Sequence, residues 1–308
     1  GCERGKGFVM SRLRRVAVPS CLLLVLAGCV ADDGQAPAND SITEAELRGD
    51  LFALSHDSMG GRLAGTDDLD RTSDWIRDRF DELALEPAGD GGTYDQHFDM
   101  VWFSLGSGSS LTVEGGGGAR QPGDGWTPSN AGAAGRAQGD VAFAGFGLVE
   151  PRLDHDYFGG TDVDGRIVLV LDREPGVSDP GSPFDGLVTT ESSRTWRKAL
   201  AAQERGAAGI LFVRDIHNRP DIADWQAYHR GQWPTERRRI ERFTLGEWID
   251  DVEIPAASIS VELARTLVAG SGRTLEELAL EAEGAEGGLG VVDLPGARID
   301  FRTAVERN

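Results

Sequence analysis

Few residues in this sequence have a type and spacing suited to catalysis. Asp154-His155-Asp156 places two carboxylates beside an imidazole, and these side chains are common metal ligands. Adjacent residues in an extended segment point in different directions, which disfavours a shared cation and favours a solvated acidic loop. His56-Asp57 is interpreted similarly, as polar residues at a helix end with a local hydrogen bond. His97 is predicted to lie in a strand, and His217 and His229 in an insertion over residues 216–253.

The motifs of common hydrolase and nucleotide sites are absent from the sequence. It contains no His-Glu-x-x-His zinc motif, no Gly-x-Ser-x-Gly elbow and no P-loop. Gly145-Phe146-Gly147 follows a predicted strand but lacks the third glycine of a dinucleotide site. The run Gly115–Gly118 is interpreted as a flexible turn, because no capped helix follows it to hold a phosphate. We therefore assign no catalytic residue and no metal ligand.

Composition limits the class of protein. The chain has 308 residues, with 31 Lys and Arg against 51 Asp and Glu, for a net charge of −20. Nucleic-acid binding requires a basic face, so this balance argues against it. A hydrophobic content of 40% with 27% charged residues is typical of a globular protein. The length predicts about two domains.

The first 28 residues are predicted to be upstream residues and a signal peptide. Three arginines after Met10 precede an apolar run over 16–27, the pattern of an export signal and too short for a membrane-spanning helix. The run ends in Leu26-Ala27-Gly28-Cys29, which resembles the bacterial lipobox. That resemblance implies lipidation of Cys29, a tether over 29–40, and an exported protein anchored in the bacterial cell envelope. An ordinary signal peptide is the alternative.

Cysteine is confined to the first 29 residues, so Cys29 would be the only cysteine in the exported protein. The mature chain is therefore predicted to hold no disulfide, no thiol nucleophile and no cysteine-bound zinc.

The elements that would position a site follow from hydrophobic periodicity and capping. Ser41-Ile42-Thr43-Glu44 has capping-box spacing, and Leu47, Leu51 and Leu54 share a face of the helix that follows. Strands are predicted at 97–103, 111–114, 140–144, 166–171, 209–213, 254–259 and 298–305, and further helices at 69–83, 193–205, after Ser260 and at 274–283.

The last predicted strand raises a packing problem. Its alternation places Ile299, Phe301 and Val305 on one side, and that apolar face needs a sheet to cover it. We expect Ile299 and Phe301 to lack downstream partners and to leave an exposed apolar edge.

Two parts of the chain resemble known protein families. Leu54–Thr66 (LSHDSMGGRLAGT), with the helix after it and the segment Gly92–Gln96, resembles the N-terminal region of zinc aminopeptidases related to aminopeptidase Y and glutamate carboxypeptidase, metallopeptidase family 28. Within that loop, Arg62 beside the glycines is expected to bind backbone carbonyls or a carboxylate.

The second resemblance is to the protease-associated (PA) domain that is often inserted in those enzymes. It rests on Val141–Gly147, Asp162–Leu169, Lys198-Ala199, Gly206–Leu211 and Ile254-Pro255-Ala256. Together the two resemblances imply a mixed α/β fold. A β-rich PA domain at 136–285 would be inserted in an incomplete α/β zinc-peptidase domain, formed by the N-terminal segment 41–135 and a truncated start of the peptidase core at 286–308.

The family's two zinc ions are bound downstream of the PA domain, and none of those ligands has a counterpart in this sequence. The resemblance therefore implies the non-catalytic N-terminal and PA portion of an exported zinc-dependent aminopeptidase-like metallopeptidase. Peptide substrate, two zinc ions and peptide-bond hydrolysis are implied only for the full-length protein, with no cofactor expected in this chain. The alternative is a non-catalytic surface lipoprotein that uses a PA domain to bind protein or peptide.

Overall fold

The computed structural model describes residues 42–308 except 117, 185, 187, 237 and 239. Cys29, the predicted signal and tether, and Ser41 lie outside the described residues. The chain divides into two compact units between Asp95 and Gln96. Within the described part, no helix combines the length and the apolar character needed to cross a membrane.

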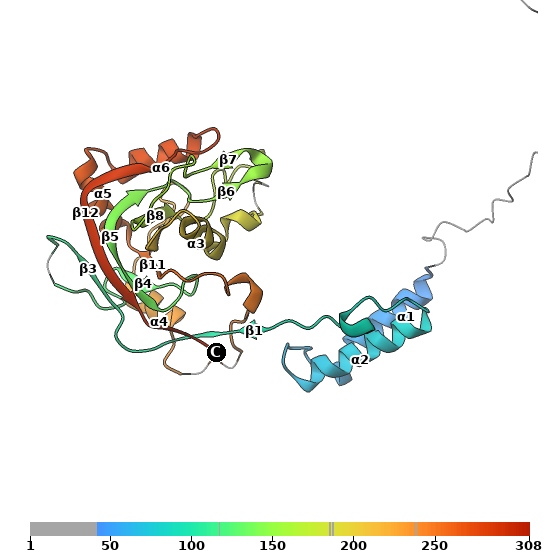
Figure 1. Cartoon of the computed structure of the whole chain (residues 1–308). Helices are drawn as coiled ribbons and strands as arrows, with labels where there is room; N and C mark the ends of the chain where they lie inside the picture. Colours follow the sequence, from blue (N-terminus) through green and yellow to red (C-terminus); the bar gives the residue numbers. More distant parts are fainter. Residues whose placement is uncertain (1–41, 117, 185, 187, 237, 239) are drawn as a thin grey trace, which may run out of the picture. The chain divides into compact units, whose positions relative to one another are not determined.

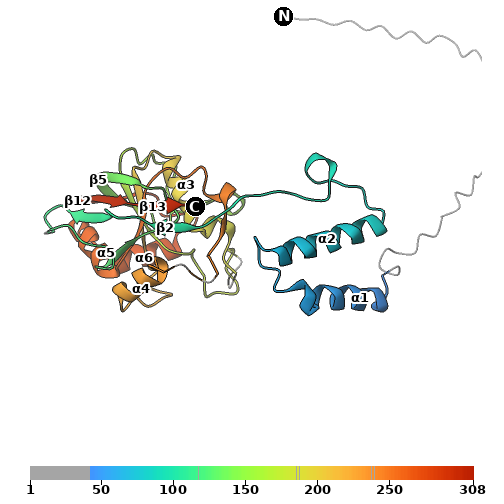
Figure 2. The same cartoon turned by 90° about the horizontal axis from the view of Figure 1, so that it is seen from below.

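The first unit is a pair of helices. α1 (Glu44–Ser55) and α2 (Asp67–Glu82) lie side by side in both views (Figures 1 and 2), with the 3₁₀ turn η2 (Asp57–Met59) between them and η3 (Asp90–Gly92) after them. The N-cap of α1 is Thr43, whose hydroxyl and amide pair with Glu46 in a capping box. The capping box therefore lies two residues after the predicted one.

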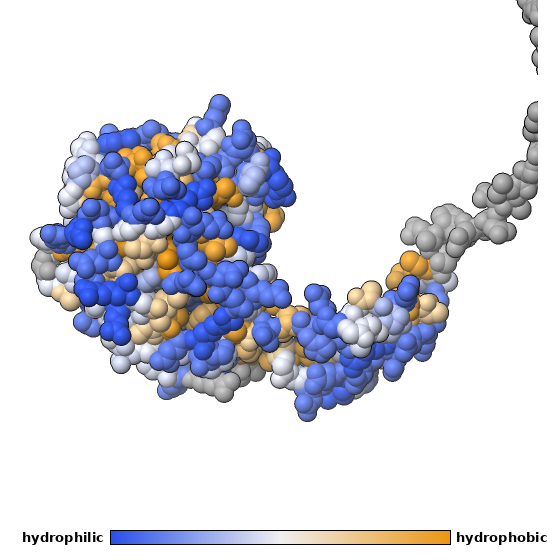
Figure 3. Space-filling view, viewed as in Figure 1, coloured by the Kyte–Doolittle hydropathy of each residue, from blue (hydrophilic) through white to orange (hydrophobic). Residues whose placement is uncertain are grey.

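The apolar face predicted for the first helix is exposed within this unit. Leu47 and Leu51 are exposed by 59% and 67%, and the neighbouring Phe52 by 63%. Figure 3 shows apolar side chains interrupting the hydrophilic surface over α1. A single pair of helices is too small to bury both helix faces, so these side chains remain in contact with solvent.

The second unit, Gln96–Asn308, is built on a seven-stranded sheet. In spatial order the strands are β3 (Ser110–Val113), β12 (Val292–Thr303), β5 (Gly135–Phe143), β8 (Ile167–Leu171), β9 (Gly209–Val213), β11 (Ala256–Ile259) and β4 (Trp126–Pro128). The four strands β5, β8, β9 and β11 are parallel, and the other three are antiparallel to their neighbours. The predicted mixed α/β class is confirmed.

Short ladders and helices complete this unit. The paired ladders are β1 (Met100–Val101) with β10 (Thr244–Leu245), β2 (Phe103–Leu105) with β13 (Val305–Arg307), seen together in Figure 2, and β6 (Val149–Glu150) with β7 (His155–Asp156). The helices are α3 (Thr195–Gln203), α4 (Trp225–Gln232), α5 (Val261–Val268) and α6 (Leu275–Gly284), with 3₁₀ turns η4 (Pro151–Leu153), η5 (Glu191–Ser193), η6 (Gly246–Trp248) and η7 (Ala269–Ser271).

The sheet is buried on both faces, as the continuous apolar run of β8 requires. Ile167, Leu169 and Leu171 belong to one core cluster, which includes the apolar side chains of α5 and α6. Val168 and Val170 alternate into a second cluster, which includes Ala199 and Ala202 of α3. The unit therefore has helices on both sides of the sheet.

The long strand β12 corrects one expectation. Ile299 and Phe301 are 1% and 0% exposed, so the predicted exposed apolar edge is wrong. β12 pairs with β3 on one side and with β5 on the other, and Figure 1 shows it curving alongside β5. Its partners lie upstream in the chain. The sheet of the compact unit 96–308 joins strands from all three segments, 41–135, 136–285 and 286–308.

Local sequence signals predicted helix ends more reliably than they predicted the packing of the last strand. Ser260 caps α5, Thr274 and Glu277 form a capping box on α6, and Gly206 after α3 has the predicted left-handed conformation, with φ 82°. His97 precedes β1, so its predicted place within a strand is wrong. The insertion over 216–253, which has no clear sequence pattern, contains α4, β10 and η6.

Candidate functional site

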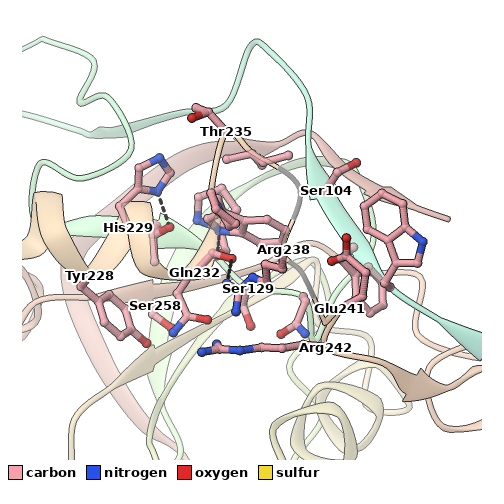
Figure 4. A pocket seen from close by; sticks show the side chains of 18 of the residues that line it. Ser104, Ser129, Tyr228, His229, Gln232, Thr235, Arg238, Glu241, Arg242 and Ser258 are labelled. Atoms are coloured by element: carbon pink, nitrogen blue, oxygen red, sulfur yellow. Dashed lines mark hydrogen bonds between the residues drawn. The ribbon is translucent and has the colours of Figure 1, made fainter. Parts of the chain in front are cut away.

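A pocket of about 720 Å³ lies within the second unit, in the size range of ligand-binding sites. Segments distant in the chain line it: 102–105, 127–130, part of α4, residues 233–236, 238, 241 and 242 after it, and Ser258 (Figure 4). Trp102, Phe103 and Tyr228 supply aromatic surface, and several neutral polar side chains lie among them. The arrangement is suited to binding a partly apolar ligand.

The position of α4 determines one side of this pocket. Asp224 caps the helix by accepting the amide proton of Ala227 at 2.8 Å. His229 lies 2.8 Å, Nδ1 to Oγ1, from Thr127, and the indole of Trp233 donates to the carbonyl oxygen of Pro128 at 3.0 Å. Two contacts therefore hold the end of α4 against β4, the last strand of the sheet.

Two carbonyl oxygens on the outer edge of β4 already accept hydrogen bonds. The carbonyl oxygen of Trp126 accepts the amide proton of Gly123 at 2.7 Å, and that of Pro128 accepts the Trp233 indole proton. Proline at 128 has no amide proton to offer. These positions of β4 are therefore not open for an added strand to pair with.

His229 is a neutral hydrogen-bonding group at neutral pH. Burial, with a smaller contribution from the charge of Arg230, lowers the pKa of its imidazole below the usual value. The sequence placed His229 in an insertion and assigned it no role. Its pairing with Thr127 brings it to the pocket wall, and the sequence gives no sign of this contact.

The charged groups of the pocket come from one arginine-rich segment. Arg238 donates to the carbonyl oxygens of Gly231 and Gln232, at 2.5 and 3.2 Å. In the part of the chain that the structure describes, Arg242 has neither a hydrogen bond nor an ion pair, although it lines the pocket. Glu236 and Glu241 also line it, and Glu241 has a partner.

Several arginines of the second unit differ from Arg238 and Arg242 in that they pair with carboxylates. Arg166 pairs with Asp293 at 2.7 Å, and Arg219 pairs with Asp172 at 2.6 Å. In an acidic chain carboxylates are readily available as partners. The two guanidinium groups at the pocket have no carboxylate partner among the described residues, so they can bind an anionic group.

The Asp154-His155-Asp156 cluster does not form a site. Asp154 has a left-handed backbone, His155 lies 2.9 Å from the Leu153 carbonyl oxygen, and Asp156 accepts the amide proton of Phe158 at 2.9 Å. Asp156 also pairs with Arg205 at 3.2 Å. The divergence of the three side chains is confirmed, but the predicted solvated loop is wrong for Asp156, which holds the turn. Among the described residues, no group of three or more His, Cys, Asp or Glu is arranged to hold a metal ion.

The loop after α1 has the predicted local contacts. The Nδ1 atom of His56 accepts the amide proton of Ser58 at 3.1 Å, so His56 caps η2. Arg62 donates to the carbonyl oxygen of Leu54, as expected for an arginine beside the glycines. Both residues therefore stabilise the loop.

Gly145 and Gly147 form a packing turn. Both have left-handed backbones, with φ +51° and +61°. A Cβ on Gly145 would lie 2.4 Å from the Tyr157 ring, and one on Gly147 would lie 2.3 Å from Val170. Their backbone therefore contacts protein side chains, in agreement with the exclusion of a dinucleotide site here.

Away from the pocket, α3 carries a fully buried lysine, Lys198. Its amine donates to the carbonyl oxygens of Leu171, at 2.9 Å, and Arg173. Burial lowers the pKa of the amine to about 7, opposed by nearby carboxylates, including those of Asp172 and Glu174. The sequence analysis used Lys198 only within the PA-domain resemblance. Because it has no exposure, it stabilises the end of β8 rather than binding a ligand.

Comparison with known proteins gives only remote likenesses. No family model matches the chain, and no curated protein matches it. Among solved structures it is similar to the aminopeptidase from Aneurinibacillus sp. strain AM-1, with 11% identity, a TM-score of 0.34, and coverage of 84% of this chain and 45% of that one.

Two further solved structures are similar at the same level. The zinc aminopeptidase BSAP from Bacillus subtilis has 13% identity and a TM-score of 0.27, covering 84% of this chain and 42% of that one. The subtilisin-like protease Apa1 from Pseudoalteromonas sp. AS-11 has 14% identity and a TM-score of 0.30, covering 66% and 35%. This chain spans less than half the length of each of these proteins, and likenesses at these TM-scores carry no conclusion about its activity.

Proposed function

We propose that this chain is the non-catalytic N-terminal and PA portion of an exported zinc-dependent aminopeptidase-like metallopeptidase, and that its second unit binds peptide. The observation that carries the binding role is the pocket beside β4, with aromatic, neutral polar and cationic side chains together. Peptides present the same three kinds of group. The resemblance of Leu54–Thr66 to metallopeptidase family 28 supports the peptidase context, in which two zinc ions belong to the full-length protein.

The test of this proposal measures peptide binding and peptide-bond hydrolysis separately. Purified chain is incubated with leucine p-nitroanilide, with and without added zinc, and its binding to short peptides is followed by tryptophan fluorescence. We expect peptide binding without hydrolysis. Aminopeptidase activity of these 308 residues that a chelator abolishes would refute the non-catalytic assignment.

A second candidate function is a surface lipoprotein that binds protein or peptide through a PA domain. The observation that favours it is the packing of β12, because Ile299 and Phe301 are buried within the unit itself. The coding sequence after Asn308 distinguishes the candidates. A reading frame that encodes a His-x-Asp motif supports the peptidase, whereas an immediate stop codon supports the lipoprotein.

Both candidates include export to the bacterial cell envelope and lipid attachment at Cys29. Metabolic labelling with an alkyne fatty acid in a bacterial host tests this proposal. We expect Cys29→Ser to abolish labelling and Cys21→Ser, in the predicted apolar run, to retain it. Equal labelling of both variants would contradict lipidation at Cys29.

A further inference from the structure

We propose that the pocket beside β4 binds the C-terminal carboxylate of a peptide whose last side chain is large and apolar. This inference rests on the proposed peptide-binding function and specifies its ligand. The pocket combines an aromatic wall with a guanidinium group, that of Arg242, which has no partner among the described residues. The aromatic wall matches the apolar side chain of such a chain end, and the guanidinium group matches its carboxylate.

The apolar part of the ligand is matched by Trp102, Phe103 and Tyr228. They come from two separate segments, which places aromatic surface on more than one side of the pocket. Figure 4 shows Tyr228 and Ser104 on opposite sides of the view. An apolar side chain that enters between these segments exchanges water for aromatic contacts, which is the main source of affinity in such pockets.

The carboxylate is matched by Arg242. Its planar guanidinium group offers paired donors that fit the two oxygens of a carboxylate, and it has no such partner among the described residues. Arg238 adds positive charge nearby, while its contacts are backbone carbonyls. The negative groups facing this region are Glu236, which is exposed, and Glu241, which has a partner.

The hydrogen bonds already made at the edge of β4 favour the end of a peptide, rather than an internal peptide segment, as the ligand. An internal peptide segment usually gains affinity by pairing its backbone with an open strand edge. Here the carbonyl oxygens of Trp126 and Pro128 already accept hydrogen bonds from Gly123 and Trp233. A terminal carboxylate needs no strand edge, because the guanidinium group of Arg242 can bind it directly.

The test compares three dansyl-labelled hexapeptides whose affinities for the full chain are measured by energy transfer from tryptophan. The first ends in phenylalanine with a free carboxylate, the second is its amide, and the third is an amide with aspartate after the phenylalanine. We expect the free acid to bind roughly tenfold more tightly than the first amide. This is the gain in affinity that one charge-assisted hydrogen bond gives in a partly exposed site. High salt should reduce this difference.

Matched variants assign the effect to one residue. Arg242→Gln should weaken binding of the free acid to the level of its amide and leave the amide unchanged. Arg302→Gln removes the same charge from an exposed position on β12 outside the pocket, and should change neither affinity. Tyr228→Ala should weaken both peptides. Circular dichroism checks that each variant is folded.

The outcomes separate the inference from the function on which it rests. Equal binding of free acid and amide, or no effect of Arg242→Gln, would overturn the carboxylate assignment and leave peptide binding intact. Tight binding of the aspartate amide would assign the anion to a side chain and overturn the chain-end assignment. Failure of all three peptides to bind would overturn the peptide-binding function itself.

Discussion

Replacing Lys198 tests how the interior of the second unit is stabilised. Apart from Lys6, Lys198 is the only lysine in a chain whose other basic residues are arginines. Its amine contacts the carbonyl oxygens of Leu171 and Arg173 in a fully buried site. A neutral amine has two N–H groups, one for each carbonyl. A guanidinium group is larger and does not deprotonate in proteins.

The pH dependence follows from the pKa of the Lys198 amine, which is about 7 in the folded chain and 10.5 when unperturbed. Between these values the unfolded chain binds one more proton, so the free energy of unfolding rises with pH by up to about 1.4 kcal/mol per unit. Below pH 7 both states are protonated, and the cost of burying the charge is fully present. Burial raises the pKa of Tyr157, which lowers stability only near pH 10 and above. The lowered pKa of His229 adds pH dependence at the acid end of the range, but it does so in the wild type and the variants alike, so differences between them from pH 6.5 to 9 report Lys198.

The Lys198→Met variant keeps the volume of the side chain but removes the donor to two carbonyl oxygens, the buried one of Leu171 and the part-buried one of Arg173. Each such oxygen costs about 1–3 kcal/mol, so we expect a loss of about 2–4 kcal/mol in the free energy of unfolding at pH 9. At pH 6.5 the loss should be smaller by about 2–3 kcal/mol, because the wild type then carries the buried charge. Lys198→Arg should lose about 3 kcal/mol or more at pH 9, because its charge remains buried, and less at pH 6.5, where the wild type also carries a buried charge.

Urea unfolding at the two pH values measures these differences, and nuclear magnetic resonance of ¹³C-lysine in a Lys6→Arg background follows the titration of Lys198 directly. A lysine signal that titrates near 10.5, or a Lys198→Met variant with the same loss at both pH values, would refute the reasoning.

Three further predictions concern the second unit. Phe301→Ala should lower the free energy of unfolding by about 3–5 kcal/mol in denaturant titrations, because the side chain is fully buried in β12; a loss below about 1 kcal/mol would show that this face is not packed. Thr274→Ala should cost about 1 kcal/mol by removing the cap of α6, whereas Thr274→Ser should retain it. Trp233→Phe keeps an aromatic ring, although a smaller one, but loses the hydrogen bond to Pro128, so we expect a loss of about 1–2 kcal/mol in the free energy of unfolding and weaker peptide affinity; unchanged peptide affinity would argue against a role for this bond in shaping the pocket.

The sequence predicted those elements whose causes lie within a few residues. The continuous apolar runs of β8 and β9 identify strands that are buried on both faces, and the hydroxyl groups of Ser260 and Thr274 mark helix starts. Such features depend on local spacing, so they can be recognised without knowing the rest of the fold.

The pocket could not be predicted in the same way. The residues that line it come from separate segments, for example Trp102, Thr127, His229 and Arg242. One side is formed by α4, which lies in the insertion over 216–253, where the sequence has no clear pattern. Residues of these types are common on protein surfaces, and only their proximity in the folded chain identifies them as the lining of a pocket. The one usable signal was the density of arginines between 230 and 242 in an acidic chain.

The sequence by itself thus determined the α/β class, the buried strands β8 and β9, and the starts of α5 and α6. Only the tertiary structure decided that β12 lies inside the sheet, with Arg298 paired to Asp140 across 158 residues, and that Lys198 is buried among carbonyl oxygens. The physical reason is that a strand's alternation records which face is apolar but not which strand will pair with it. Pairing depends on the folded positions of distant segments, and those positions also create the pocket.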